Sequence, residues 1–124
     1  MTRDSYIKLL KEMEVFYKSI NKIRYKNLDN SLITFGHSGF KHLLTKNRKE
    51  RAINEQFRKL SLLKYLLEVI NSDNPIIDKR ILSSKEYGSI EYVSIVKHID
   101  NRNIKVILRK LGGGNYHFWS IMDY

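Results

Sequence analysis

Cysteine is absent from this chain of 124 residues. Its absence excludes disulfide frameworks, thiol nucleophiles and cysteine metal sites, although it does not fix the compartment in which the protein acts. No apolar run approaches the length needed to cross a bilayer, and the polar start Met1-Thr2-Arg3-Asp4 does not resemble a signal peptide. The sequence therefore predicts no membrane span.

Acidic residues are also few, with 13 Asp and Glu against 23 Lys and Arg. A two-metal nuclease needs clustered carboxylates, and no such cluster stands out in the sequence. His37 and His42 do not have the i, i+4 spacing that places two metal ligands on one helix face. We therefore expect no metal site, no cofactor and no small-molecule ligand.

The formal net charge is +10. A small domain this basic is usually attracted to polyanions, with nucleic acid as the first candidate partner, an acidic protein as the second and an anionic membrane surface as the third. Lysines that simply solvate the surface explain the charge equally well. Charge alone does not choose between a nucleic-acid partner and a solvated surface.

The length predicts one domain over residues 1–124. Apolar residues follow helical spacing from Tyr6 to Ile23, where Thr2 or Asp4 caps the helix, and again from Ile53 to Ile70. The remaining N-terminal pattern predicts a break at 27–30, a short strand at 31–35, a turn at 36–39, one or two helical turns at 40–46, a capping box formed by Asn47 and Glu50, and a stop at 71–75.

The C-terminal part favours strands. Residues 76–87 are ambiguous and read as a loop with a short strand, whereas 90–99 alternate as a strand does and 100–103 form a turn. A β-hairpin follows from 104 to the end. The order predicts an α+β fold, with N-terminal helices packed on one face of a C-terminal antiparallel sheet of about four strands.

The hairpin turns at Gly112-Gly113-Gly114-Asn115. A four-residue loop places Leu111 opposite Tyr116, and residues opposite each other share a face of the sheet. The polar face then carries Arg109, Phe118 and Ser120, and the core face carries Val106, Leu108, Trp119 and Ile121. Phe118 and Tyr116 become candidates for base stacking, and His117 near the turn reaches solvent or substrate. A loop one residue shorter or longer reverses this parity for one strand.

The segment 36–44 carries the second notable pattern. If Ser38 caps a helix, Lys41 and His42 lie in its first turn, where free N–H groups and the helix dipole form a phosphate site. The same positive end would keep His42 neutral and suited to act as a general base. Taken alone, His42 fits a half-buried structural histidine better. Among the basic residues that follow, Arg48 and Arg51 are phosphate candidates, whereas Lys49, Lys59 and Lys64 fit a solvated helix face.

Three pieces occur in a familiar order: His-Ser-Gly-Phe-Lys-His at 37–42, a basic helix with a Leu-rich end at 51–70, and Tyr-His-Phe-Trp-Ser-Ile at 116–121. Together they resemble the barnase–EndoU–colicin–RelE superfamily of small ribonucleases, particularly its phage-associated and polymorphic-toxin branches, over about residues 31–122. The resemblance implies helices on one face of a four-stranded antiparallel sheet, and metal-independent cleavage of RNA, often tRNA, on the opposite face.

Such cleavage proceeds by attack of the ribose 2′-hydroxyl on phosphorus and leaves a 2′,3′-cyclic phosphate. The resemblance supports His42 as base or acid, Lys41 as a phosphate contact, Arg109 as the cation that stabilises the transition state, and Ser120 as a contact to a phosphoryl oxygen. Neither His98 nor His117 has motif support, so the second proton-transfer residue stays open. The alternative is a basic domain that binds RNA or DNA without catalysis.

A toxic ribonuclease needs an inhibitor in the cell that makes it. An acidic immunity protein or antitoxin that covers Arg109 and the basic helix suits the charge of this chain. The expected place of action is the cytoplasm, either of the producer or of a target cell.

Overall fold

The computed structural model describes residues 2–72 and 75–124. Within these residues, four α-helices and eight strands follow one another along the chain. The helices are α1 (Arg3–Ser19), α2 (His37–Leu44), α3 (Ile53–Leu62) and α4 (Leu66–Ile70), and a 3₁₀ turn at Leu63–Tyr65 joins the last two. The strands are β1 (Ile23–Tyr25), β2 (Ser31–Thr34), β3 (Thr45–Lys46), β4 (Lys49–Glu50), β5 (Ile76–Ser84), β6 (Gly88–Ile99), β7 (Arg102–Leu111) and β8 (Tyr116–Asp123).

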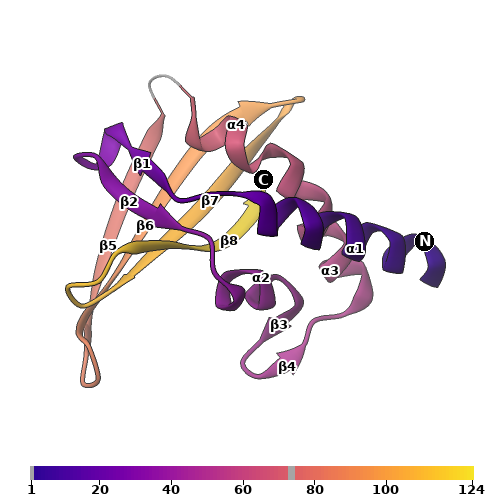
Figure 1. Ribbon diagram of the computed structural model, residues 1–124, viewed down its shortest axis with the longest axis horizontal. Coiled ribbons are helices and arrows are strands. Elements are labelled where there is room, and N and C mark those ends of the chain that lie inside the picture. Colours follow the sequence, from indigo (N-terminus) through magenta and orange to yellow (C-terminus); the bar gives the residue numbers. More distant parts are fainter. Residues whose placement is uncertain (1, 73–74) are drawn as a thin grey trace.

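Six strands form the main sheet in the order β1-β2-β8-β7-β6-β5, as Figure 1 shows. The four C-terminal strands form an antiparallel meander, and β2 joins its edge by parallel pairing of Ile33 and Thr34 with Tyr116 and His117. The predicted α+β fold is therefore confirmed. The sheet has two more strands than expected, because β1 and β2 extend it beyond β8.

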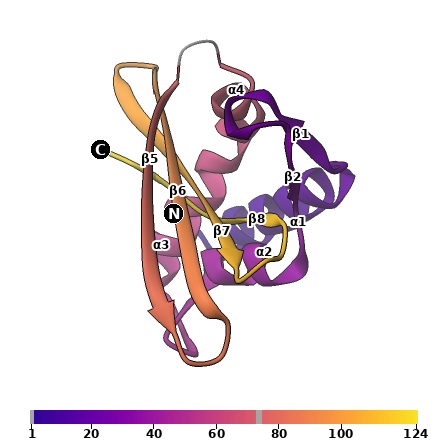
Figure 2. The same ribbon diagram turned by 90° about the vertical axis from the view of Figure 1, so that its left-hand side faces the viewer.

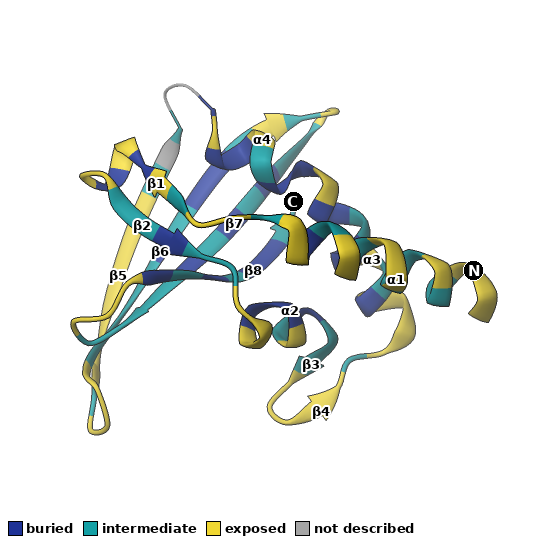
Figure 3. Cartoon of the chain, viewed as in Figure 1, coloured by how far each residue is buried: buried dark blue, intermediate teal, exposed yellow. Residues whose placement is uncertain are grey.

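The helices lie on one face of the sheet, so in Figure 2 β5 and β6 stand in front while α1 and α3 lie behind them. Thr2 caps α1 by accepting a hydrogen bond from the Ser5 backbone N–H at 3.1 Å, as the sequence predicts. Leu60 and Ile70 are buried in the same hydrophobic core as Val106 and Leu108 of the sheet. Figure 3 shows buried, dark-blue segments on the helices and on the sheet. This single core leaves the opposite face of β5, β6 and β7 uncovered by helices.

The predicted capping box at Asn47 and Glu50 is wrong. Asn47 and Arg48 have φ of 53° and 65° and form the two-residue turn between β3 and β4. Two consecutive positive φ angles suit a tight hairpin, and Asn tolerates that conformation well. The helix begins only at Ile53, and β3 and β4 project from α2 as a short arm.

The segment between α4 and β6 differs in part from its prediction. The helix ends at Ile70 with Asn71 as its C-cap, and residues 73–74 of the predicted stop at 71–75 lie outside the described residues. The segment 76–87 is mainly strand rather than loop, because β5 pairs with β6 from Ile76 to Ser84. As an edge strand β5 exposes most of its side chains, which hid the alternation that a half-buried strand shows.

The register of the terminal hairpin differs from the prediction near the turn. Ile107 pairs with Ser120 as expected, but Leu108 pairs with Phe118 and Arg109 with His117, because the strand bulges at Trp119. Because β8 has one extra residue at the bulge, its side chains between the bulge and the turn point to the opposite face of the sheet from the one predicted. Phe118 therefore enters the core with no exposed surface, whereas Trp119 leaves it.

Candidate functional site

Helix α2 is held against the edge of β8 that β2 leaves unpaired. Gly39 makes this contact, since a Cβ atom at that position would lie 2.2 Å from the carbonyl oxygen of Phe118. The Tyr17 hydroxyl also donates a 2.8 Å hydrogen bond to the carbonyl of Gly36, the N-cap residue. The close approach fixes where the side chains of α2 lie relative to β8.

The helix begins earlier than predicted. Its N-cap is Gly36 rather than Ser38, so Lys41 and His42 lie in its last turn and not its first. The proposed phosphate site at the helix N-terminus is therefore wrong for these two residues. The sequence predicts a turn at Gly39. In the structure this glycine lies within α2, where its lack of a side chain allows the helix to approach the backbone of β8 at Phe118.

Trp119 lies between two predicted site residues. The His42 imidazole stacks on the indole with ring centroids 3.9 Å apart and an interplanar angle of 16°, and the Arg109 Cζ lies 3.5 Å from the indole centroid. Two groups this close to one centroid cannot share a face without overlap, so they occupy opposite faces of the ring. Trp119 thus joins α2 to β7 and separates the imidazole from the guanidinium.

Arg109 is oriented by a second contact. Its Nε donates a hydrogen bond to His117 Nε2 at 3.0 Å, which requires that this ring nitrogen carry no proton. Burial and the Arg109 charge both lower the pKa of His117, which favours the same neutral form. His117 therefore positions the guanidinium and is poorly suited to donate a proton.

His42, Arg109 and Trp119 border a pocket of about 530 Å³, whereas His117 is not one of its lining residues. Among the described residues, four cationic side chains line it and no carboxylate does. The lining residues are Ser38, Lys41, His42, Thr45, Lys46, Asn47, Arg48, Arg109 and Trp119. Such a pocket suits an anionic group, with the indole as its apolar wall.

The environment of His42 lowers its imidazole pKa to about 4. Burial contributes most, and the charges of Arg51, Lys59, Arg109 and Lys46 add to it. A neutral His42 imidazole was predicted from the positive end of the helix dipole. His42 lies instead near the negative end of α2, so burial and the neighbouring cations keep it neutral. At pH 7 the imidazole is unprotonated and able to accept a proton.

Arg51 supports the site from outside the pocket. Its side chain is only 6% exposed, its Nε donates to the His42 carbonyl at 3.1 Å, and its Nη1 pairs with Glu55 at 2.7 Å. The first contact holds the last turn of α2, and the second connects Arg51 to α3. Arg51 therefore acts on His42 through its charge and position, whereas Arg48 is exposed in the β3–β4 turn and borders the pocket.

Three other predicted site residues lie in the interior. Ser120 is 3% exposed and 3.5 Å from Lys59 Nζ, which also donates to the Ile121 carbonyl at 3.1 Å. Phe118 packs against Tyr17 and Phe35, and the hydroxyl of buried Tyr116 donates to Glu91. None of the three borders the pocket with His42 and Arg109.

Sequence reasoning missed Trp119 and Lys46. The bulge that turns Trp119 outward has no glycine or other marker in the sequence. Lys46 reaches the pocket because β3 continues directly from α2, and the Asn47-Arg48 pair was the available sign of a tight turn there.

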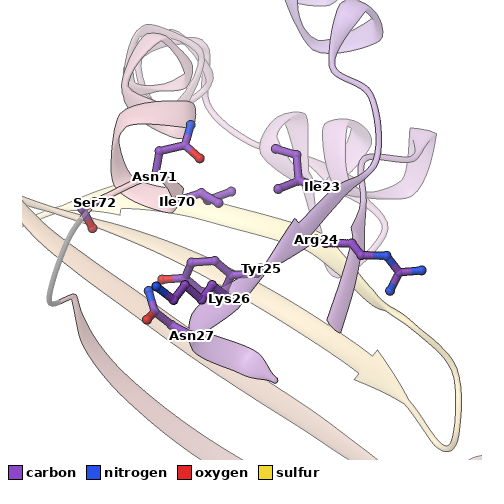
Figure 4. A pocket seen from close by; sticks show the side chains of 8 residues that line it. All are labelled: Ile23, Arg24, Tyr25, Lys26, Asn27, Ile70, Asn71 and Ser72. Atoms are coloured by element: carbon purple, nitrogen blue, oxygen red, sulfur yellow. The ribbon is translucent and has the colours of Figure 1, made fainter. Parts of the chain in front are cut away.

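A second hollow of about 500 Å³ lies between β1 and the end of α4. Figure 4 shows Tyr25, Asn27 and Asn71 around it, while Arg24 extends away from Tyr25 and donates to the Asn30 carbonyl at 3.2 Å. The buried Tyr25 hydroxyl has no hydrogen-bond partner among the described residues. Among the described residues, no histidine or carboxylate lines this hollow.

Within residues 2–72 and 75–124, no three His, Asp or Glu side chains are grouped to hold a metal ion. None of the described helices is long and apolar enough to cross a membrane. Fold and pocket together define an α+β protein with a cationic pocket beside the edge of its sheet. Compared with protein-family models, curated proteins and solved structures, the chain gives no match.

Proposed function

We propose that this protein is a metal-independent endoribonuclease. The observation that carries the proposal is an unprotonated His42 in the same cationic pocket as Arg109, Lys41 and Lys46. Cleavage of RNA without a metal needs a base for the 2′-hydroxyl and cations for the phosphate, and this pocket offers both. The proposal agrees with the resemblance to small toxin ribonucleases.

In the proposed reaction, His42 takes the proton of the ribose 2′-hydroxyl. The 2′-oxygen forms a bond to phosphorus, the bond from phosphorus to the 5′-oxygen breaks, and a 2′,3′-cyclic phosphate remains. The departing 5′-oxygen takes a proton from water, since the pocket is open and His117 is held as an acceptor for Arg109. Lys41 and Arg109 balance the charge that grows on the phosphoryl oxygens.

The indole places a condition on where the phosphate binds. Because His42 and Arg109 stack on opposite faces of Trp119, a phosphate that contacts both must lie at the rim of the ring. A bound anion there also favours the charged imidazole and raises the His42 pKa from its low value. Substrate binding would thereby strengthen the base.

The test is incubation with total RNA in excess EDTA, followed by analysis of the product ends. The proposal predicts that cleavage persists and that the products carry 2′,3′-cyclic phosphates. Cleavage that EDTA abolishes, or products with 5′-phosphates, would contradict it.

A non-catalytic nucleic-acid-binding domain is the second candidate. The aromatic and cationic stack of Trp119 with Arg109 favours it, because such pairs bind single strands without any chemistry. Binding by such a domain should survive His42→Ala and weaken steeply with salt, with no RNA cleavage by the wild type.

A further inference from the structure

The pocket continues onto the open face of the sheet. The register places Arg80 of β5 opposite Tyr92 of β6, Tyr92 opposite Arg109 of β7, and Arg109 opposite His117 of β8. Residues opposite one another share a face, so these four form one row, here called the cross-sheet row. It ends at the Arg109 guanidinium that stacks on Trp119.

The cross-sheet row faces away from the helices. The adjacent row on the other face contains Val93, Leu108 and Phe118, all with no exposed surface. In contrast, Arg80 is exposed and Tyr92 is half-buried. Figure 2 shows β5 and β6 in front of the helices, so none of the described helices covers this part of the sheet.

We propose that the cross-sheet row extends the pocket into a binding strip for a single-stranded nucleic acid. Tyr92 stacks on a base, and Arg80 contacts a phosphate beyond the one held at the pocket. Tyr92 lies between two arginines whose strands are each about 4.8 Å from its own, and this order of cation, ring and cation matches the alternation of phosphate and base along a nucleic-acid strand. The proposed ribonuclease activity makes that strand RNA, and the inference rests on it for this point.

The rows on either side of the cross-sheet row also suit a single-stranded nucleic acid. One side of the cross-sheet row is bordered by Leu82, Ile90 and Leu111, which offer apolar surface to bases. The other side begins with Asp78, whose charge repels a phosphate and so limits the strip on that edge. A duplex keeps its bases stacked on one another and offers Tyr92 no free ring, which favours a single strand.

The test is the affinity of the full chain for a single-stranded 2′-O-methyl oligonucleotide of about ten nucleotides. This probe lacks the attacking hydroxyl, so binding is measured whether or not the protein cleaves RNA. Arg80→Ala should weaken binding about threefold or more at low salt, and the difference should shrink by about threefold between 50 and 200 mM salt. Lys79→Ala is the matched control, because Lys79 is equally exposed but faces the other side of β5.

Tyr92→Ala should weaken binding about tenfold or more, whereas Tyr92→Phe keeps the ring and should change it less than about twofold. Equal effects of Arg80→Ala and Lys79→Ala would overturn the strip, as would a duplex that binds as tightly as the single strand. Stronger, Arg80-dependent binding to polyglutamate would identify a protein interface and also overturn it. Normal strip binding without RNA cleavage would contradict the proposed function alone.

Discussion

His42 and Trp119 stack face to face across the contact between α2 and β8, with ring centroids 3.9 Å apart. The opposite face of the indole carries the Arg109 guanidinium. One side chain, turned outward by a single bulge, thus positions both groups to which we assign the chemistry.

Trp119 is therefore expected to be a positioning residue. Trp119→Ala removes the surface on which His42 and Arg109 rest and should lower kcat/KM for RNA about tenfold or more. Trp119→Phe keeps part of the stacking surface and should retain more activity than the alanine variant. Equal activity of wild type and Trp119→Ala, with both proteins folded by circular dichroism, would show that the stack has no part in cleavage.

The stability of the protein should fall as the pH is lowered from 7 towards 4. The pKa of His42 is about 4 when folded, below its usual value near 6.5, so the unfolded chain binds more protons between these values. The stabilising effect of neutral His42 is complete above pH 6.5 and is lost as the pH falls towards 4. His117 shifts in the same direction. His42→Phe keeps a ring on Trp119 and cannot titrate, so its melting temperature should depend less steeply on pH.

Gly39→Ala should strongly destabilise the fold. The added methyl group meets the backbone oxygen of Phe118, which belongs to a paired strand and has little freedom to move. We expect the free energy of unfolding to fall by about 2 kcal/mol or more in urea denaturation. Gly113→Ala is the matched control, because nothing lies within 4 Å of the added group. Similar losses for both variants would contradict the packing described for α2.

Ser120→Ala tests whether this residue contacts the phosphate, as the sequence predicts, or only packs in the interior. Since Ser120 is buried beside Lys59 and outside the pocket, we expect kcat to change less than about threefold. The free energy of unfolding should fall modestly, by about 1 kcal/mol, because the Lys59 ammonium loses a partner. A loss of activity of two orders of magnitude in a stable variant would restore Ser120 to the chemistry.

Local signals predicted much of the fold. The Thr2 cap and the alternation of β6 each depend on neighbours in the chain, and the structure shows both. The apolar stripe predicted from Ile53 to Ile70 is confirmed only from Leu60 onward, because Ile53 is exposed. Edge strand β5 was harder to predict, because its exposed side chains carry no apolar alternation.

The candidate site depended on long-range packing that no local pattern reveals. His42 and Arg109, which the sequence analysis names as site residues, line the same pocket from opposite faces of Trp119. The bulge at Trp119 arises from how β8 meets β7 and α2. It places Phe118 in the core, where Trp119 was predicted, and turns Trp119 to the face predicted for Phe118. Likewise, Gly39 looked like a turn residue because its contact with β8 is absent from the sequence around it.

The most direct test compares wild type, His42→Ala and His37→Ala for cleavage of a single-stranded RNA in EDTA. His37 lies at the exposed start of the same helix and outside the pocket, so it controls for general effects of losing an imidazole. We expect EDTA-resistant cleavage by wild type and His37→Ala, and a rate lower by about two or more orders of magnitude for His42→Ala. A loss of less than about threefold for His42→Ala would contradict its assignment as the base, and an inactive wild type would contradict the ribonuclease proposal itself.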